Sequence, residues 1–169
     1  MPHKTYENKT QALINARKIL NHTKADMIKI EIDKNKLDIV KYLSNKNINV
    51  VAHIGVTPQV YRDFSKIKIR GRTKNDKKIL INLALKSEIY GAKAILLECI
   101  AEKTAKTITS SITIPTIGIG ASKYCNGQIL VFDDLINLNL NKKPPRFVKN
   151  FMDFTKQSKD AVRKFARDV

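Results

Sequence analysis

Short apolar runs alternate along the chain with longer stretches in which apolar residues recur at helical spacing. The first such stretch follows Asn8, which can cap a helix, and it places Ala12, Ala16 and Leu20 on one face. Further helices are predicted over residues 36–45, 75–90 and 101–110, and a C-terminal helical segment over about 145–169, with one or two helices between 147 and 165. This alternation is typical of βα units around a parallel sheet.

The apolar runs predict about five strands, over residues 27–31, 49–53, 94–97, 113–119 and 129–132. The run 94–97 is apolar throughout, as in a strand that is buried on both faces. Gly91 is expected just after the end of the preceding helix, and a long polar loop is expected between Gly55 and Arg72. We therefore expect an α/β fold that forms a single domain over residues 1–169.

The length and composition fit a globular chain of this kind. At 169 residues it suffices for one domain but is short for an eight-stranded α/β barrel, which needs about 250 residues. No apolar run approaches the roughly 18 residues that span a bilayer, and the N-terminus does not resemble a secretion signal, so we expect a cytoplasmic protein with no membrane partner. Cys99 and Cys125 lack metal-ligand spacing and are expected in the core or in loops.

The formal net charge of +17 would by itself predict nucleic-acid binding. The excess is nearly all lysine, however, with 25 Lys against 7 Arg, and it accompanies 22 Ile and 14 Asn. All three residue types have A/T-rich codons, so genome composition explains the bias without a partner. Phosphate recognition favours arginine, and no aromatic stacking platform is evident. A basic nucleic-acid-binding module is therefore the less favoured alternative.

Polar residues follow several predicted strands directly. Glu31, His53, Glu98 and the turn Gly118–Gly120 all stand at carboxyl ends of strands. Loops converge at this end of a parallel α/β fold, so these residues should face one common site.

Each of these residues also has an interpretation without function. Glu31 is equally well explained as the first polar residue after a buried strand, and His53 as a hydrogen-bonded structural histidine. Glu98 is different, because a carboxylate that follows four apolar residues must be desolvated or specifically paired, and either condition suits a general base. The Gly118–Gly120 turn lacks the third glycine of a dinucleotide-binding motif. Asp133–Asp134 could bind a cation, but a helix N-cap is favoured.

Seven segments, in order, resemble ketopantoate hydroxymethyltransferase, the enzyme that opens pantothenate synthesis. The match extends to about residue 155, and its segments are ADMIKIE from Ala25, AHIGVTPQ from Ala52, IRGRT from Ile69, AILLECI from Ala94, IPTIGIGA from Ile114, CNGQILVFDD from Cys125 and PPRFVKNF from Pro144. Each segment alone is weak evidence for the family, whereas seven segments in the family's order are specific evidence.

The resemblance implies the C-terminal part of a (β/α)8 TIM barrel of the phosphoenolpyruvate/pyruvate type. It implies transfer of a hydroxymethyl group from 5,10-methylenetetrahydrofolate to 3-methyl-2-oxobutanoate, which gives 2-dehydropantoate. In the family, Mg²⁺ chelates the keto acid and stabilises its enolate. By this resemblance Glu31 is a metal-site glutamate, Lys29 contacts the keto acid, Glu98 is the proton acceptor and His53 lies in the pocket. The family is homo-oligomeric.

The chain also departs from the family pattern. Ile32–Asp33 replaces two glycines after the metal-site glutamate, and Asp133–Asp134 replaces a histidine-aspartate pair. Two aspartate ligands of the Mg²⁺ and a serine beside one of them would fall before Met1, together with the first three strands. One carboxylate cannot hold a hard cation that relies on several oxygen ligands. Two hypotheses follow: an enzyme whose missing strands come from elsewhere, or an inactive truncated remnant.

Overall fold

The computed structural model describes residues 1–60, 68–138, 147–149, 151–152 and 157–169. Residues 61–67 of the expected long loop lie outside this part. The chain divides into two compact units, Met1–Asn126 and Gly127–Val169. Whether the two units fold as the single domain expected from the sequence stays a prediction.

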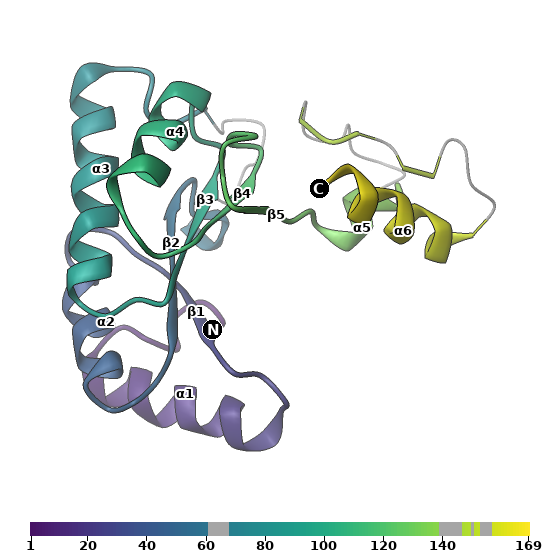
Figure 1. The fold of residues 1–169 in the computed structure, drawn as a ribbon. Coiled ribbons are helices and arrows are strands. Elements are labelled where there is room, and N and C mark those ends of the chain that lie inside the picture. Colours follow the sequence, from purple (N-terminus) through teal and green to yellow (C-terminus); the bar gives the residue numbers. More distant parts are fainter. Residues whose placement is uncertain (61–67, 139–146, 150, 153–156) are drawn as a thin grey trace. The chain divides into compact units, whose positions relative to one another are not determined.

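The first unit is built on a parallel sheet (Figure 1). Its strands are β1 (Ile28–Glu31), β2 (Val50–Gly55), β3 (Ala94–Glu98) and β4 (Thr116–Ile119). They pair in chain order, β1 with β2, β2 with β3 and β3 with β4, always parallel. A parallel sheet with a helix in each crossover is the repeating unit of an α/β barrel, so the expected partial (β/α)8 barrel is confirmed.

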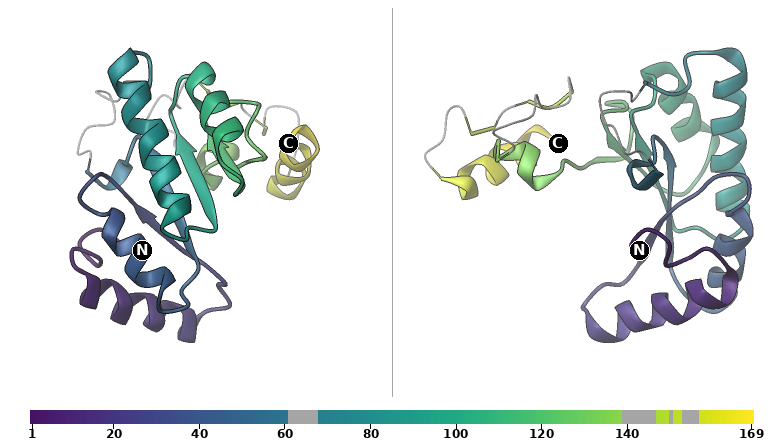
Figure 2. Two further views of the ribbon diagram at one scale, coloured as in Figure 1. Left: turned by 60° about the vertical axis from the view of Figure 1, so that its left-hand side comes forward. Right: turned by 180° about the vertical axis from the view of Figure 1, so that it is seen from behind.

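Helices cover one face of this sheet. They are α1 (Lys9–His22), α2 (Leu37–Ser44), α3 (Lys74–Ile89) and α4 (Glu102–Ser111), and a short 3-10 helix, η1 (Pro58–Val60), follows β2. Figure 2 shows α2, α3 and α4 on the same side of the strands. Alternate strand residues, among them Ile30, Ala52 and Leu97, are buried in one core with Val40 of α2 and Leu80 of α3. Burial of this apolar surface is the main force that holds the unit together.

The opposite face of the sheet is more open. Side chains alternate between the two faces of a strand, so Lys29, Val51 and His53 lie opposite the helices. Lys29 is exposed and Val51 is half-buried, whereas His53 is fully buried. In a closed barrel this face is the interior.

The second unit corrects two expectations. Its elements are β5 (Gly127–Gln128), α5 (Phe132–Leu135) and α6 (Ser158–Asp168). The expected fifth strand exists, but its predicted bounds 129–132 are wrong, because β5 ends at Gln128. Val131 and Phe132 are 51% and 52% exposed, and Leu130 packs, partly buried, against the small core of this unit. Asp133–Asp134 lie in the first turn of α5, and its N-cap is Val131, so the predicted aspartate N-cap is also wrong.

The C-terminal helical segment is present but shorter than expected. Helix α6 begins only at Ser158, and the described residues of 147–157 are not helical. Its Ala161 is buried with Leu135 and Phe151 in a small core, where the Phe151 and Phe165 rings meet edge to face at 5.6 Å between centroids. None of the helices in the described part of the chain is both long and apolar enough to cross a membrane.

The predicted cap of α1 is confirmed and can be tested. Asn8 Oδ1 accepts a hydrogen bond from the backbone N–H of Gln11 at 2.9 Å. We expect Asn8→Ala to lower the free energy of unfolding by about 1 kcal/mol, because that N–H loses its acceptor. Urea denaturation followed by circular dichroism measures the change. Asn8→Asp is the matched control and should stay within a few tenths of wild type; an equal loss in both variants would contradict the cap.

Candidate active site

The parallel register brings three polar side chains to one face of the sheet. Glu31 of β1 pairs with His53 of β2, and His53 pairs with Leu96 of β3, two residues before Glu98. His53 Nδ1 lies 3.8 Å from Glu31 Oε1, and His53 Nε2 lies 3.2 Å from Glu98 Oε2. The imidazole therefore stands between two carboxylates from its two neighbouring strands.

Several buried polar atoms of this cluster have no hydrogen bond within the described part of the chain. They are Oε2 of Glu31 and both ring nitrogens of His53, whose contacts with the carboxylates are close but do not have hydrogen-bonding geometry. The exposed fractions of Glu31 and His53 are 4% and 0%. A buried polar group left without a partner costs about 1–3 kcal/mol. Such an arrangement suits a site whose partners arrive from outside these residues.

Among the described residues, only one oxygen of the Glu31 carboxylate accepts a hydrogen bond. The backbone N–H of Gln59 donates to Glu31 Oε1 at 3.2 Å, and the Tyr6 hydroxyl donates to Gln59 Oε1 at 2.8 Å. The same hydroxyl accepts from the backbone N–H of Glu31, and burial raises the pKa of Tyr6. Oε1 is thus fixed while Oε2 stays available. Gln59 and Tyr6 were not predicted as site residues, although Gln59 ends the AHIGVTPQ segment.

Glu98 is placed by a close approach of β2 and β3. Its backbone carbonyl accepts from Val56 N–H at 2.9 Å, and its register partner is Gly55. Gly55 has φ +107°, and a Cβ there would lie 2.3 Å from the Glu98 carbonyl oxygen, so only glycine fits. The next residue, Cys99, has a positive φ of +49°, and its N–H donates to Ile119 O. The chain therefore turns sharply just after Glu98.

The remaining predicted residues lie further from this cluster or have a different environment. Lys29 shares the face of Glu31, two residues earlier, but its side chain is exposed. The Gly118–Gly120 turn does stand at the carboxyl end of β4, where Gly120 has φ +57°. Ile32 is buried and Asp33 caps a turn by accepting from Asn35 and Lys36 N–H. Neither residue has the positive φ that would require glycine.

The described residues do not make a complete metal site. Among them no three His, Cys, Asp or Glu side chains are grouped so that they could hold a metal ion. Glu31 supplies one available carboxylate oxygen, but hard divalent cations need several oxygen ligands. Further ligands would have to come from outside the described residues.

The fold and the site together define a class. A parallel α/β sheet with helices on its outer face, and with carboxylates and a buried histidine at the carboxyl ends of its strands, is the arrangement of the α/β-barrel enzymes. The family model described as ketopantoate hydroxymethyltransferase matches residues 1–169. The chain belongs to this family, and the resemblance inferred from its seven segments is confirmed.

Curated relatives agree with this assignment. The chain is similar over its whole length to proteins named 3-methyl-2-oxobutanoate hydroxymethyltransferase, with 45% identity to that of Pelagibacter ubique, 38% to that of Aliarcobacter butzleri and 41% to that of Buchnera aphidicola. It covers 64%, 62% and 64% of these proteins. The chain thus spans slightly less than two thirds of the length of the curated relatives that it matches.

The pKa of the Cys99 thiol depends on its burial and on the charge of the neighbouring Glu98. Burial raises the pKa of its thiol to about 11, and the nearby Glu98 carboxylate adds to the rise. At pH 8 the thiolate fraction should be roughly 100-fold below that of a thiol of ordinary pKa. In a Cys125→Ser background, we expect iodoacetamide to label Cys99 far more slowly than it labels glutathione.

Replacement of Glu98 tests the second cause of this shift. Glu98→Gln removes the negative charge, so labelling of Cys99 should accelerate, as measured by mass spectrometry over time. The conservative variant Glu98→Asp keeps the charge and serves as the control. If Cys99 reacted as fast as glutathione in the unsubstituted protein, the buried and negatively charged surroundings would be refuted.

Proposed function

We propose that this chain serves the reaction of 3-methyl-2-oxobutanoate hydroxymethyltransferase, either alone or as one part of the complete barrel. In this reaction 3-methyl-2-oxobutanoate, 5,10-methylenetetrahydrofolate and water give 2-dehydropantoate and tetrahydrofolate. The observation that carries the proposal is the Glu31–His53–Glu98 cluster in a chain of this family. In this cluster Glu31 Oε2 and both His53 ring nitrogens are buried without a hydrogen bond among the described residues.

Glu98 is the proposed general base. Removal of the proton from C3 of the keto acid leaves an enolate, and C3 then forms the new carbon–carbon bond with the one-carbon unit. The Glu98 side chain is 17% exposed, so a substrate can reach it, and His53 Nε2 beside it limits its freedom. A base must lie within hydrogen-bond reach of the proton that it takes, and the carboxyl end of β3 is where barrel substrates bind.

Lys29 and Glu31 are the proposed binding residues. The exposed Lys29 ammonium stands on the face that a closed barrel turns inward, where it would offset the negative charge of the keto acid. Glu31 keeps Oε2 available while Gln59 holds Oε1. We propose that this oxygen contributes to a Mg²⁺ site together with ligands from outside the described residues. Homo-oligomerisation and a cytoplasmic location belong to the same proposal.

A catalytically inactive remnant is the second candidate. Two observations favour it: within the described residues no three donors are grouped around a metal, and Lys29 is exposed on a face that a complete barrel would cover. Both hypotheses predict the same fold, so only measurements of binding and turnover separate them.

The half-reaction at Glu98 gives the sharpest test of the enzyme hypothesis. In D₂O with Mg²⁺, this chain mixed with the segment of the Pelagibacter ubique relative that it does not match should exchange the C3 hydrogen of 3-methyl-2-oxobutanoate for deuterium, which proton NMR follows. With the folate donor the same mixture should form 2-dehydropantoate. Glu98→Ala should slow both by about 10²- to 10⁴-fold, because the base is lost. Ile14→Ala, an exposed position on α1, is the control. Exchange that persists in Glu98→Ala would exclude Glu98 as the base.

Mg²⁺ binding should distinguish this chain alone from a complete barrel. We expect no saturable binding by this chain alone in calorimetry, because the described residues group no three donor side chains around a metal and a hard cation needs several oxygen ligands. Mixing it with the segment of the Pelagibacter ubique relative that it does not match should create a saturable site, and Glu31→Gln should weaken that site. Tight binding by the chain alone would contradict the ligand count. Exchange that stays absent even in the mixture would favour the inactive remnant.

A further inference from the structure

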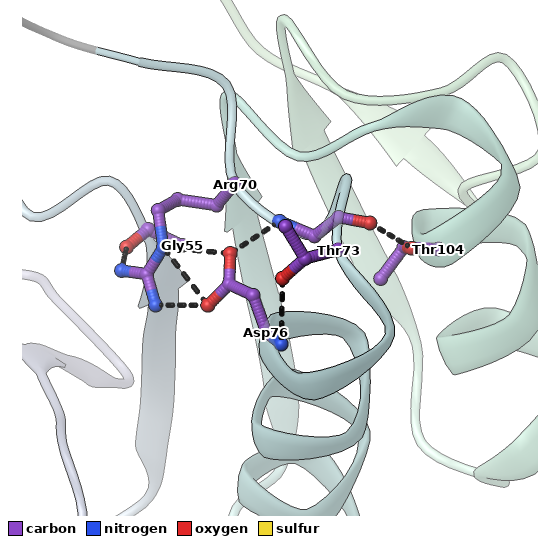
Figure 3. Close-up of polar contacts among 6 residues, drawn as sticks. Gly55, Arg70, Thr73, Asp76 and Thr104 are labelled. Carbon is purple, nitrogen blue, oxygen red and sulfur yellow. Dashed lines mark hydrogen bonds and ion pairs between the residues drawn. The ribbon is translucent and has the colours of Figure 1, made fainter.

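Arg70 lies at the carboxyl ends of β2 and β3: its side chain donates to Gly55 O (Figure 3), and its backbone N–H donates to the carbonyl of Cys99, the residue after the candidate base. We propose that the ion pair between Arg70 and Asp76 is a positioning device for Glu98, which holds the turn that follows this residue against the end of β2. The inference rests on the proposed role of Glu98 and adds two residues to the machinery of the site.

The backbone of Arg70 holds the turn directly. Its N–H donates to Cys99 O at 2.9 Å, and its carbonyl accepts from Ala101 N–H at 2.8 Å, so that Arg70 forms a parallel bridge with Ile100. These two hydrogen bonds fasten the three residues that follow Glu98. Because Cys99 has a positive φ, which is rare for a residue with a side chain, this turn needs such outside support.

The side chain of Arg70 holds the other strand. Its Nη1 donates to the backbone carbonyl of Gly55 at 3.1 Å. Gly55 is the register partner of Glu98 and stands two residues after His53 on the same face of β2. One arginine therefore fixes the backbone at the ends of both strands that carry the proposed base and its histidine.

Asp76 fixes the orientation of the guanidinium. Arg70 Nη2 lies 2.6 Å from Asp76 Oδ1, and Nε lies 3.2 and 3.1 Å from its two carboxylate oxygens. Asp76 also accepts from Gly71 N–H at 2.5 Å, and the neighbouring guanidinium lowers the pKa of its carboxyl. Asp76 lies in the first turn of α3, whose N-cap Thr73 accepts from its backbone N–H. The pair is thus anchored in a rigid helix.

Helix α4 closes the arrangement from the other side. The Thr104 hydroxyl donates to the carbonyl of Gly71 at 2.8 Å, and a Cβ on Gly71, whose φ is +78°, would meet the Thr104 side chain at 2.9 Å. The segment that carries Arg70 is therefore held between α3 and α4. Lysine could replace the charge of Arg70 but not its planar fork, which here bonds a carboxylate and a carbonyl at once.

Labelling of Cys99 tests whether the pair holds the turn. In a Cys125→Ser background, Asp76→Asn and Arg70→Lys should each raise the iodoacetamide labelling rate about tenfold or more under native conditions, because the turn opens locally. Arg163→Lys is the control, since Arg163 pairs with Asp160 in the exposed helix α6. Circular dichroism identifies the variants that remain folded, and two different substitutions guard against one that does not fold. An unchanged rate in both folded variants would overturn the proposal.

A double substitution tests whether the Arg70–Asp76 pair positions Glu98 itself, again through the labelling rate of Cys99. With the pair intact, Glu98→Gln accelerates labelling of Cys99, because the carboxylate charge is close. If Asp76→Asn frees Glu98 to move away, its charge no longer affects Cys99. The ratio of the labelling rate in the Asp76→Asn/Glu98→Gln double variant to that in Asp76→Asn should then approach one. If Glu98→Gln accelerates Cys99 labelling in the Asp76→Asn background as much as it does with the pair intact, Glu98 has stayed in place and the positioning role is wrong. This measurement needs no turnover, so it stands even if the proposed reaction fails.

Exchange kinetics connect the pair to the reaction. In a preparation that exchanges the C3 hydrogen of the keto acid, Asp76→Asn should lower the maximal rate about tenfold while KM stays within twofold, and Arg70→Lys should retain more activity than Arg70→Gln. In a Glu98→Gln background Asp76→Asn should have no further effect. An equal loss in that background would mean that the pair acts without Glu98. Absence of exchange in the unsubstituted protein would count against the proposed function alone.

Discussion

The parallel register of three neighbouring strands is the constraint on which the site depends. Because Glu31 pairs with His53, and Gly55 with Glu98, two carboxylates and an imidazole must lie on one face at the carboxyl ends of β1, β2 and β3. The opposite faces of the same strands are buried against the helices. A shift of one residue in any strand would turn its polar side chain into that core, so apolar packing and the geometry of the site enforce each other.

The surroundings of the cluster share one feature: they hold part of it in place, while Glu31 Oε2 and both ring nitrogens of His53 have no hydrogen bond within the described part of the chain. Gln59 bonds one oxygen of Glu31, and the segment around Arg70 holds the chain after Glu98. This rigid support and the large apolar core offset the free-energy cost of burying these atoms of Glu31 and His53 without a hydrogen bond among the described residues. Strain and unsatisfied polar groups of this kind gather at functional sites, where a ligand relieves them.

The same structure shows why membership of the family and activity of the chain are separate questions. The fold, the segments and the relatives all agree on ketopantoate hydroxymethyltransferase. Yet the chain spans under two thirds of those relatives, and among its described residues no three donor side chains are grouped to hold a metal ion, while Lys29 is exposed. A barrel interior functions when its wall is closed around the substrate, since exclusion of water strengthens each electrostatic contact.

The sequence by itself determined the order of strands and helices, the cap at Asn8 and the gathering of Glu31, His53 and Glu98 at the strand ends, because these follow from local periodicity and from the geometry of parallel sheets. It failed at residues 129–132, where an apolar run has no sheet partner to bury it. Only the tertiary structure decided the partners of these residues. Gln59 belongs to η1, Arg70 precedes α3, and Asp76 lies in the first turn of α3. Such contacts depend on where distant segments meet, which no local pattern encodes.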